Sequence, residues 1–272
     1  MEYVEYGSTG IEVSRLCLGT GHVRGAYPVP ADGGRLLEEA LENGVTFWDT
    51  AEGYGSHPHV GAALRRVERS RVVIQTKTPE REHAAAAAKV DAYLQELGTD
   101  YLDVLLLHGV NSPRDLEVRA GALQALVEAK QAGKVRAVGC STHIYTGPVM
   151  DAVTACPAIE VILATVNKGG IMLEGSIVDP APDAPRVPAE PRMDQHIEQV
   201  RAAFAAGKGI SIMKIIGQRK APEAEWEEWI TWGYEFPYAH SVNLGITHSP
   251  ELHLDVRLAR TAHRRIPLRQ AA

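Results

Sequence analysis

Four side chains with complementary acid–base chemistry lie at or near the ends of short apolar runs. Asp49, Lys77 and His108 each close such a run, and Tyr54 follows Asp49 after a short glycine-containing segment. An apolar run that closes on an ionisable residue is typical of a strand whose carboxyl end opens into an active site. We therefore predict that these four residues form one catalytic group.

The chemistry of this group is proton donation to an oxygen. A tyrosine has a pKa of about 10, so it is a weak acid at neutral pH unless a nearby cation stabilises its phenolate. Lys77 can supply that cation, and Asp49 can supply the counter-ion that a half-buried lysine needs. His108 can hydrogen-bond a substrate oxygen and orient it toward Tyr54. This is half of a carbonyl reduction, and because no side chain delivers the hydride, a nicotinamide cofactor is implied.

The elements that must position these residues alternate in a regular way. Apolar runs and helical patterns follow one another after a short hairpin around residues 7–10, and several helices close on a glycine, as left-handed helix ends do. We predict strands at residues 15–19, 46–50, 72–77, 102–108, 135–141, 161–167, 210–216 and 242–247. We predict the clearest helices at residues 34–42, 83–97, 121–132, 194–206, 223–232 and 250–260.

Eight strands separated by helices predict a (β/α)8 barrel with an N-terminal β-hairpin, formed as a single domain by residues 1–272. The carboxyl ends of all the strands meet on one face of such a barrel, which brings Asp49, Lys77 and His108 together. An open doubly wound sheet is the alternative. It is disfavoured because the glycines of residues 18–25 do not fit the dinucleotide-binding spacing and no clear helix starts there.

The composition favours a small-molecule partner. The 272 residues carry a net charge of -6, whereas binding of a nucleic acid needs clustered Lys and Arg. Cys17, Cys140 and Cys156 form no CxxC pair, which favours a reducing compartment. The acidic N-terminus is unlike a signal peptide, and no apolar run is long enough to span a bilayer. We predict a cytoplasmic protein that binds neither nucleic acid nor membrane.

Several motifs occur in order along most of the chain. They are residues 10–20, Asp49-Thr50-Ala51 with Tyr54-Gly55, Val60-Gly61 with Leu64, Thr76-Lys77, residues 97–103 leading into His108, and residues 133–141. This ordered combination resembles the aldo-keto reductase family.

The resemblance implies a (β/α)8 barrel that reduces aldehydes or ketones with NADPH. It also implies that Asp49, Tyr54, Lys77 and His108 are the catalytic tetrad, with Tyr54 as the general acid. A cofactor site is expected from the same resemblance, with these candidate residues: Gly19, Thr20, Ser141, Asn167, Lys214, Thr247 and His248.

Three positions depart from the pattern of that family. His57 stands where the family has a glutamate, and residues 163–167 lack the usual glutamine and aromatic residue. Residues 247–252 lack the Lys or Arg that many members place against the 2'-phosphate of NADP. NAD as the cofactor, weaker cofactor binding and a loss of redox activity therefore stay open.

Other functions also stay open. Lys168 and Lys214 offer amines in a barrel, which suits a Schiff-base lyase, because a desolvated lysine can lose its proton and attack a carbonyl. A non-redox binding barrel that kept the tetrad is a third interpretation. His57 and His59 are separated by one residue, and together with His108 and His143 they could suggest a metal site. The spacing supplies no third ligand with defined geometry, so we predict no metal site.

Two further segments have both a structural and a functional interpretation. Trp226, Trp229 and Trp232 recur at helical spacing, which favours a packed helix face, part of which borders the site. The five prolines of residues 179–191 are typical of a stiff surface connection. Because long loops after barrel strands often carry binding, we favour a substrate-side lid there.

Overall fold

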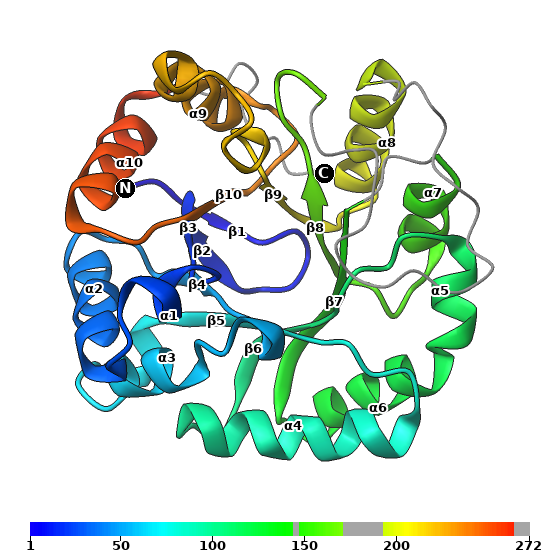
Figure 1. Ribbon diagram of the computed structural model, residues 1–272. Coiled ribbons are helices and arrows are strands. Elements are labelled where there is room, and N and C mark those ends of the chain that lie inside the picture. Colours follow the sequence, from blue (N-terminus) through cyan, green and yellow to red (C-terminus); the bar gives the residue numbers. More distant parts are fainter. Residues whose placement is uncertain (144–146, 171–192, 264–272) are drawn as a thin grey trace.

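In the part of the chain that the structure describes, residues 1–143, 147–170 and 193–263, eight parallel strands close into a barrel inside a ring of helices (Figure 1). The structure is a computed structural model. Its closed barrel confirms the predicted (β/α)8 fold. The strands are β3 (Leu16–Gly19), β4 (Phe47–Asp49), β5 (Val73–Thr78), β6 (Leu102–Leu107), β7 (Val135–Thr142), β8 (Val161–Thr165), β9 (Gly209–Met213) and β10 (Ser241–Gly245).

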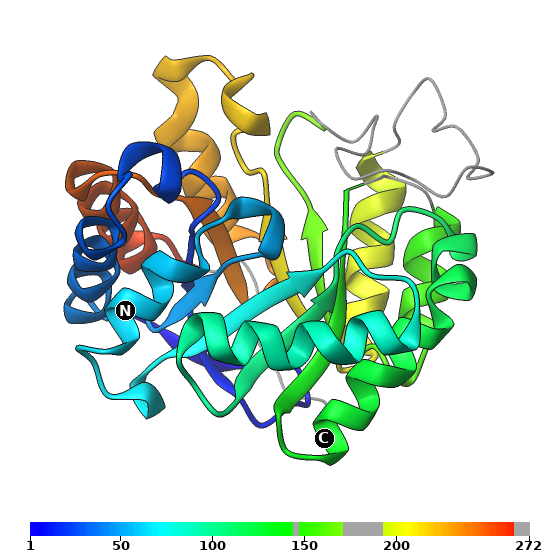
Figure 2. The ribbon, with the colours of Figure 1, turned by 60° about the horizontal axis from the view of Figure 1, so that its bottom comes forward.

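The predicted N-terminal hairpin is also confirmed. Strands β1 (Tyr3–Glu5) and β2 (Glu12–Ser14) pair antiparallel, and Figure 2 shows them below the barrel, at the end opposite to α9. Buried side chains of the hairpin segment, among them Tyr6 and Ile11, pack against the apolar side chains inside the barrel. The hairpin therefore plugs one end of the barrel and leaves the other end open for a site.

The connecting helices follow the predicted alternation, with additions. Helices α1, α3, α5 and α7 were not predicted, because each is short or lacks a polar face. None of the helices in the described ranges has the length and apolar character to cross a membrane. The α-helices are α1 (Val23–Ala26), α2 (Pro30–Glu42), α3 (His57–Leu64), α4 (His83–Leu97), α5 (Pro113–Val118), α6 (Ala120–Gln131), α7 (Gly147–Ala155), α8 (Met193–Ala205), α9 (Trp226–Glu235) and α10 (Ser249–Thr261).

Some predicted boundaries were wrong by a few residues. The strand predicted at 210–216 ends at Met213, because Lys214 has a φ of 59° and a strand cannot continue through a left-handed residue. The helix predicted at 223–232 starts at Trp226, because residues 223–225 form a 3-10 turn. The strand predicted at 102–108 ends at Leu107, so His108 lies in the loop that follows it.

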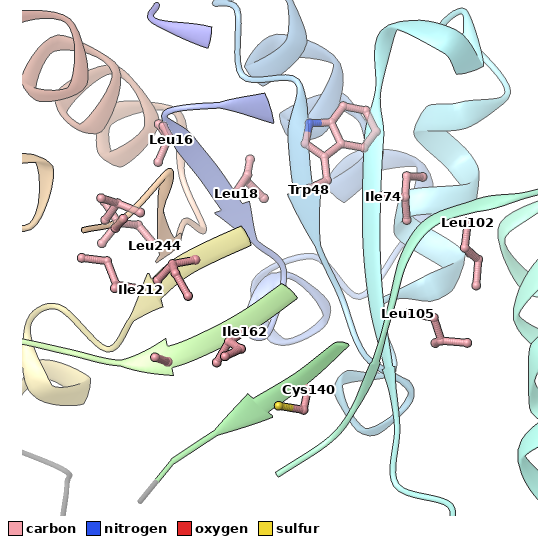
Figure 3. Close-up of a cluster of buried hydrophobic side chains, with 14 of the residues drawn as sticks. Leu16, Leu18, Trp48, Ile74, Leu102, Leu105, Cys140, Ile162, Ile212 and Leu244 are labelled. Carbon is pink, nitrogen blue, oxygen red and sulfur yellow. The ribbon is translucent and has the colours of Figure 1, made fainter. Parts of the chain in front are cut away.

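Two apolar layers lie on the two sides of the strands. Alternate residues of a strand point to opposite faces, so Leu16 and Leu18 face the helices whereas Cys17 faces the barrel interior. Figure 3 shows the outer layer, which includes Leu16, Leu18, Trp48, Ile74, Leu105, Ile162, Ile212 and Leu244.

Inside the barrel, apolar side chains give way to polar ones toward the carboxyl ends of the strands. Phe47 on β4 and Val73 on β5 belong to the inner apolar cluster. Two residues further along β4, Asp49 points to the same interior and accepts a hydrogen bond from Gln75 at 2.7 Å. The apolar layer thus supports a polar layer on which the site is built.

Candidate active site

Lys77 connects the predicted catalytic residues. Its Nζ donates to both carboxylate oxygens of Asp49, at 2.6 and 2.7 Å, and to the backbone oxygen of Thr50 at 2.8 Å. The hydroxyl of Tyr54 lies 3.3 Å from the same nitrogen. Lys77 is only 1% exposed and Asp49 only 2%. The structure therefore brings the ammonium, the carboxylate and the phenol into one buried contact.

The turn that carries Tyr54 is held in place by α4. Tyr54 ends the 3-10 turn η1 (Glu52–Tyr54), which Gly55 closes with a φ of 63°. The carboxylate of Glu52 accepts hydrogen bonds from Lys89 and from the hydroxyl of Tyr93, the latter at 2.6 Å. A loop anchored in this way positions the phenol more precisely than a free surface loop would.

His57, which departs from the family's pattern, also helps to fix this region. Its Nδ1 donates to the carboxylate of Glu96 at 2.5 Å, and its Nε2 accepts from the hydroxyl of Thr76 at 2.8 Å. Burial lowers the pKa of His57, against the opposing effect of Glu96. A neutral imidazole thus links α3 to the strand that carries Lys77.

Burial and charge act in opposite directions on the two central groups. Burial alone would lower the pKa of Lys77, but Asp49 and Tyr54 raise it above its ordinary value. Burial raises the pKa of Tyr54, and the nearby ammonium of Lys77 offsets only part of that rise. The phenol is therefore protonated at neutral pH, and Lys77 is charged.

His108 adds a neutral imidazole beside the phenol. Its ring lies edge-on to the ring of Tyr54, with centroids 6.0 Å apart. Burial and the positive charges of Lys77, Arg119 and Lys214 lower its pKa to about 3. Arg119 also fixes the loop, since its Nη1 donates to the backbone oxygen of His108 at 2.7 Å. At neutral pH His108 can donate one N–H to an oxygen without carrying charge.

A cavity of about 610 Å³ opens above this group, within the size range of small-molecule sites. Asp49, Tyr54 and His108 line one end of it. The cavity continues over the ends of β9 and β10 to α9 and α10. Residues lining that part include Met213, Lys214, Ile215, Gln218, Arg219, Trp226, Ile230, Gly245, Glu251, Leu254 and Asp255.

Of the seven expected cofactor residues, Gly19 and Lys214 line the cavity. A Cβ at Gly19 would lie 2.5 Å from the side-chain Oδ1 of Asn243 and 3.1 Å from the backbone oxygen of Leu244, so a side chain there would require Asn243 to shift. Thr20 is fully buried, and its hydroxyl donates to the backbone oxygen of Asp49 at 3.0 Å.

The other four expected cofactor residues do not border the cavity. The hydroxyl of Ser141 accepts from the backbone N–H of Gly109 at 2.9 Å, and Asn167 is fully buried. The Thr247 hydroxyl lies 2.6 Å from Nδ1 of His248 and donates to Glu251 at 2.8 Å. The structure thus brings all four tetrad residues into one group at the cavity, whereas only two of the seven cofactor candidates line it.

A strained segment after β9 was not anticipated as a whole. Lys214, Gln218 and Arg219 have φ values of 59°, 55° and 66°, and they are the non-glycine residues with positive φ in the described ranges. All three line the cavity. A left-handed residue other than glycine costs about 1–2 kcal/mol, and such strain clusters at functional sites. Of these three residues, Lys214 alone was among the candidates that we expected from the sequence.

Two carboxylates lie one helical turn apart at the far end of the cavity. Glu251 accepts from Arg219 at 2.9 Å and from the backbone N–H of Thr247 at 2.9 Å. Asp255 is 6% exposed, and burial together with the charge of Glu251 raises its pKa to about 7. Sequence reasoning missed Asp255, because its spacing within α10 is that of an ordinary surface residue.

The remaining predicted features have mixed outcomes. Trp226 borders the cavity, whereas Trp229 is buried in the packed face of α9. Lys168 pairs with Glu228 and does not line the cavity. No group of three or more metal-binding side chains lies together in residues 1–143, 147–170 and 193–263. The proposed lid at residues 179–191 lies outside the described residues.

The chain is similar in sequence to known aldo-keto reductases. The chain is 30% identical over 200 residues to the aldo-keto reductase YhdN of Bacillus subtilis, an alignment that covers 67% of this chain and 59% of that protein. It is 31% identical over 172 residues to the NADH-specific methylglyoxal reductase of Escherichia coli, covering 52% of each chain. The chain spans about half the length of the curated relatives it matches.

Solved structures agree on the fold. The holo form of the aldo-keto reductase AKR11C1 from Bacillus halodurans superposes with a TM-score of 0.73 at 18% identity, covering 97% of this chain and 92% of that one. The sequence profile of the Aldo/keto reductase family matches residues 15–156, just over half of the chain and the part that carries the tetrad. The chain therefore belongs to the aldo/keto reductase family.

Proposed function

We propose that this protein reduces an aldehyde or ketone with hydride from a nicotinamide cofactor, and that Tyr54 is the general acid. One observation carries the proposal: the Lys77 ammonium bridges the carboxylate of Asp49 and the hydroxyl of Tyr54 beside a cavity of small-molecule size. Two named relatives are consistent with it, the aldo-keto reductase YhdN and the NADH-specific methylglyoxal reductase.

The residues around the cavity fit a nicotinamide dinucleotide. Lys214 and Arg219 supply positive charge for phosphates, and Gly19 and Gly245 keep the backbone accessible. When bound, the nicotinamide supplies the hydride. We expect NADPH from the family and hold NADH as the alternative, because residues 247–252 lack the Lys or Arg that many members place against the 2'-phosphate of NADP.

The proton pathway follows from the contacts of the side chains. His108 donates an N–H to the carbonyl oxygen and polarises it. Tyr54 then gives its proton to the same oxygen, which is far more basic than a phenolate once it becomes an alkoxide. The Lys77 ammonium stabilises the phenolate left behind, and Asp49 keeps Lys77 charged and oriented.

The proposal is tested by following the hydride itself. The protein is incubated with an aldehyde and with NADPH or NADH carrying deuterium at C4 of the nicotinamide, and the alcohol is analysed by mass spectrometry. We expect deuterium at the carbinol carbon. Cofactor binding is measured separately by quenching of the fluorescence of Trp226, with W226F as the control. Binding of either cofactor without any labelled alcohol from a panel of aldehydes would refute the reductase.

A Schiff-base lyase is the second candidate, because Lys214 lies in the cavity and burial lowers its pKa to about 8. At pH 7 that pKa still leaves most of the amine protonated and therefore not nucleophilic. Lys168, the other candidate amine, pairs with Glu228 away from the cavity. We expect no covalent adduct after borohydride treatment with an aldehyde, whereas an adduct at Lys214 would favour the lyase.

A further inference from the structure

The segment that carries Tyr54, residues 52–57, is bonded to several parts of the barrel, and we call it the Tyr54 turn. Two of its side chains anchor it to α4 and to the ends of β3 and β4. Among the described residues, His57 is the member of this turn, apart from Tyr54 itself, whose side chain bonds to β5. Its Nε2 lies 2.8 Å from Oγ1 of Thr76. His57 therefore links the segment that carries the phenol to the strand that carries Lys77.

Thr76 and Lys77 are consecutive residues of β5 and point to opposite sides of the strand, as neighbouring strand residues do. Lys77 points into the barrel, where its Nζ donates to Asp49 and lies 3.3 Å from the hydroxyl of Tyr54. Thr76 points outward to His57. The bond to Thr76 thus fixes the strand at the residue next to the ammonium. The separation of the phenol and the ammonium depends on how the Tyr54 turn lies on β5, and this bond holds the two segments together.

His57 is itself fixed on several sides. It is only 2% exposed, and its Nδ1 donates to the carboxylate of Glu96 at 2.5 Å. Its ring lies edge-on to that of Tyr93, with centroids 5.1 Å apart. Because a carboxylate only accepts hydrogen bonds, Nδ1 carries the proton and Nε2 accepts from the hydroxyl of Thr76. A side chain with both nitrogens bonded and its ring packed can hold the turn in one position.

The imidazole of His57 is neutral at pH 7. The charged groups that face it are Glu96 of α4, Glu52 of the Tyr54 turn and Lys77 of β5. Burial has the largest effect and lowers the pKa of His57, against the opposing effect of the two carboxylates. Removing the imidazole would therefore leave the net charge around Tyr54 unchanged. A shift in the pKa of Tyr54 after such a removal would report a change in geometry.

We propose that His57 is a positioning residue: through Thr76 it sets the distance between the Tyr54 hydroxyl and the Lys77 ammonium, and thereby the ability of Tyr54 to donate its proton. This inference rests on the proposed reductase function. His57 is not one of the described residues that line the cavity, so it acts only through the turn and the strand that it links. Without this link the turn can move away from β5, and the ammonium then stabilises the phenolate less.

The test removes one hydroxyl from the link. T76V keeps the shape of threonine without its hydroxyl, and it should raise the pKa of Tyr54 by about one pH unit, at the lower end of the effect of a nearby opposite charge. It should also lower kcat about 10- to 100-fold, because a misplacement of about 1 Å can cost about 100-fold. T76S retains the hydroxyl and should keep most of both wild-type values. T99V is the matched control, because Thr99 bonds to Arg69 at the amino-terminal end of β6, away from the site.

The pKa of Tyr54 is measured without any reaction, which separates this inference from the proposed function. Fluorotyrosine replaces tyrosine throughout and acidifies each phenol, and the fluorine NMR signal that Y54F lacks identifies Tyr54. A shifted titration in T76V without any reduction by the wild type would support the positioning role and refute the reductase. A titration of T76V identical to that of the wild type would refute the positioning role alone, even if the variant were less stable or less active.

A double-mutant cycle assigns the shift to the bond between the two side chains. H57A should reproduce the shift of T76V, and T76V should add nothing further in the H57A background, because the bond is already lost. H57A also serves as the second variant if T76V does not fold. Two shifts that add in the double variant would mean that the side chains act independently, and they would overturn the proposal.

Discussion

Two lysines at the carboxyl ends of barrel strands, Lys77 near the end of β5 and Lys214 directly after β9, have opposite surroundings. Lys77 has four oxygen atoms within 3.3 Å of its Nζ, two of them from Asp49. Lys214 has no hydrogen-bond partner in the described part of the chain. The pKa of Lys77 is raised by its neighbours, whereas burial lowers that of Lys214 to about 8.

The difference divides the site into two halves. The paired half, around Lys77, is preorganised, whereas the unpaired half, around Lys214 and the far end of the cavity with Asp255, awaits a ligand. Around Lys77 the charges of the ammonium and of Asp49 are paired, so the geometry proposed for catalysis exists before any ligand binds. Around Lys214 the backbone is left-handed and the charge is uncompensated, and both features destabilise the folded protein. Such costs are common at sites where function requires them.

The largest expected effect comes from breaking the paired half at its acid. Tyr54→Phe removes the proton donor and should lower kcat/KM for reduction by a factor of about 10² to 10⁴. The phenyl ring preserves the packing, so Kd for the cofactor should change little. Steady-state kinetics and a fluorescence titration measure the two quantities. Wild-type turnover in this variant would exclude Tyr54 from the mechanism.

Removing the ammonium of Lys77 should destabilise the folded protein and change the pKa of Tyr54. Lys77→Met leaves Asp49 buried and unpaired, which should cost about 3–5 kcal/mol in the free energy of unfolding. It should also raise the pKa of Tyr54 further, because the stabilising ammonium is lost. Urea denaturation and an ultraviolet titration of the phenol test both effects. A tyrosine titration identical to that of the wild type would contradict the pairing.

The pH dependence of stability that Asp255 causes tests the unpaired half of the site. Its folded pKa of about 7 lies above its ordinary value of 3.8, so the folded state holds a proton that the unfolded chain has released. Stability should therefore fall as pH rises from about 4 to 7. Asp255→Asn removes this penalty and should stabilise the protein by about 2–4 kcal/mol at pH 8 but not at pH 3. Denaturation at the two pH values provides the comparison, and equal effects at both would be inconsistent with the raised pKa.

The smallest effect is the most direct contrast between the two lysines. Burial lowers the pKa of Lys214 from 10.5 to about 8 in the folded state. The charge of Lys214 therefore destabilises the folded protein fully below pH 8, and this destabilisation disappears as the pH rises to about 10.5. Lys214→Met should therefore stabilise the ligand-free protein by about 1–2 kcal/mol at pH 7, in contrast to Lys77→Met. Thermal unfolding of the two variants side by side measures this. A destabilised Lys214→Met would mean that the amine has a partner in the folded state.

The contrast also shows how far sequence reasoning reached. The barrel was predicted from the alternation of apolar runs and helices. The predicted ends of β4 and β5 were within one residue of the observed ends, which was accurate enough to place Asp49 beside Lys77. One departure lies directly after β9, where the predicted strand continued through Lys214. No local pattern marks the left-handed backbone at Gln218 or Arg219, because neither is a glycine.

The sequence by itself determined the barrel, its plugging hairpin and the four residue types that meet at its open end, because periodicity and residue chemistry are local properties of the chain. The tertiary structure alone decided which buried charges have partners. Lys77 and Lys214 look alike in the sequence, and their difference arises from whether a distant segment brings a carboxylate within hydrogen-bonding distance. That pairing depends on three-dimensional packing, and it determines that Lys77 contacts the phenol of Tyr54 whereas Lys214 has no hydrogen-bond partner among the described residues.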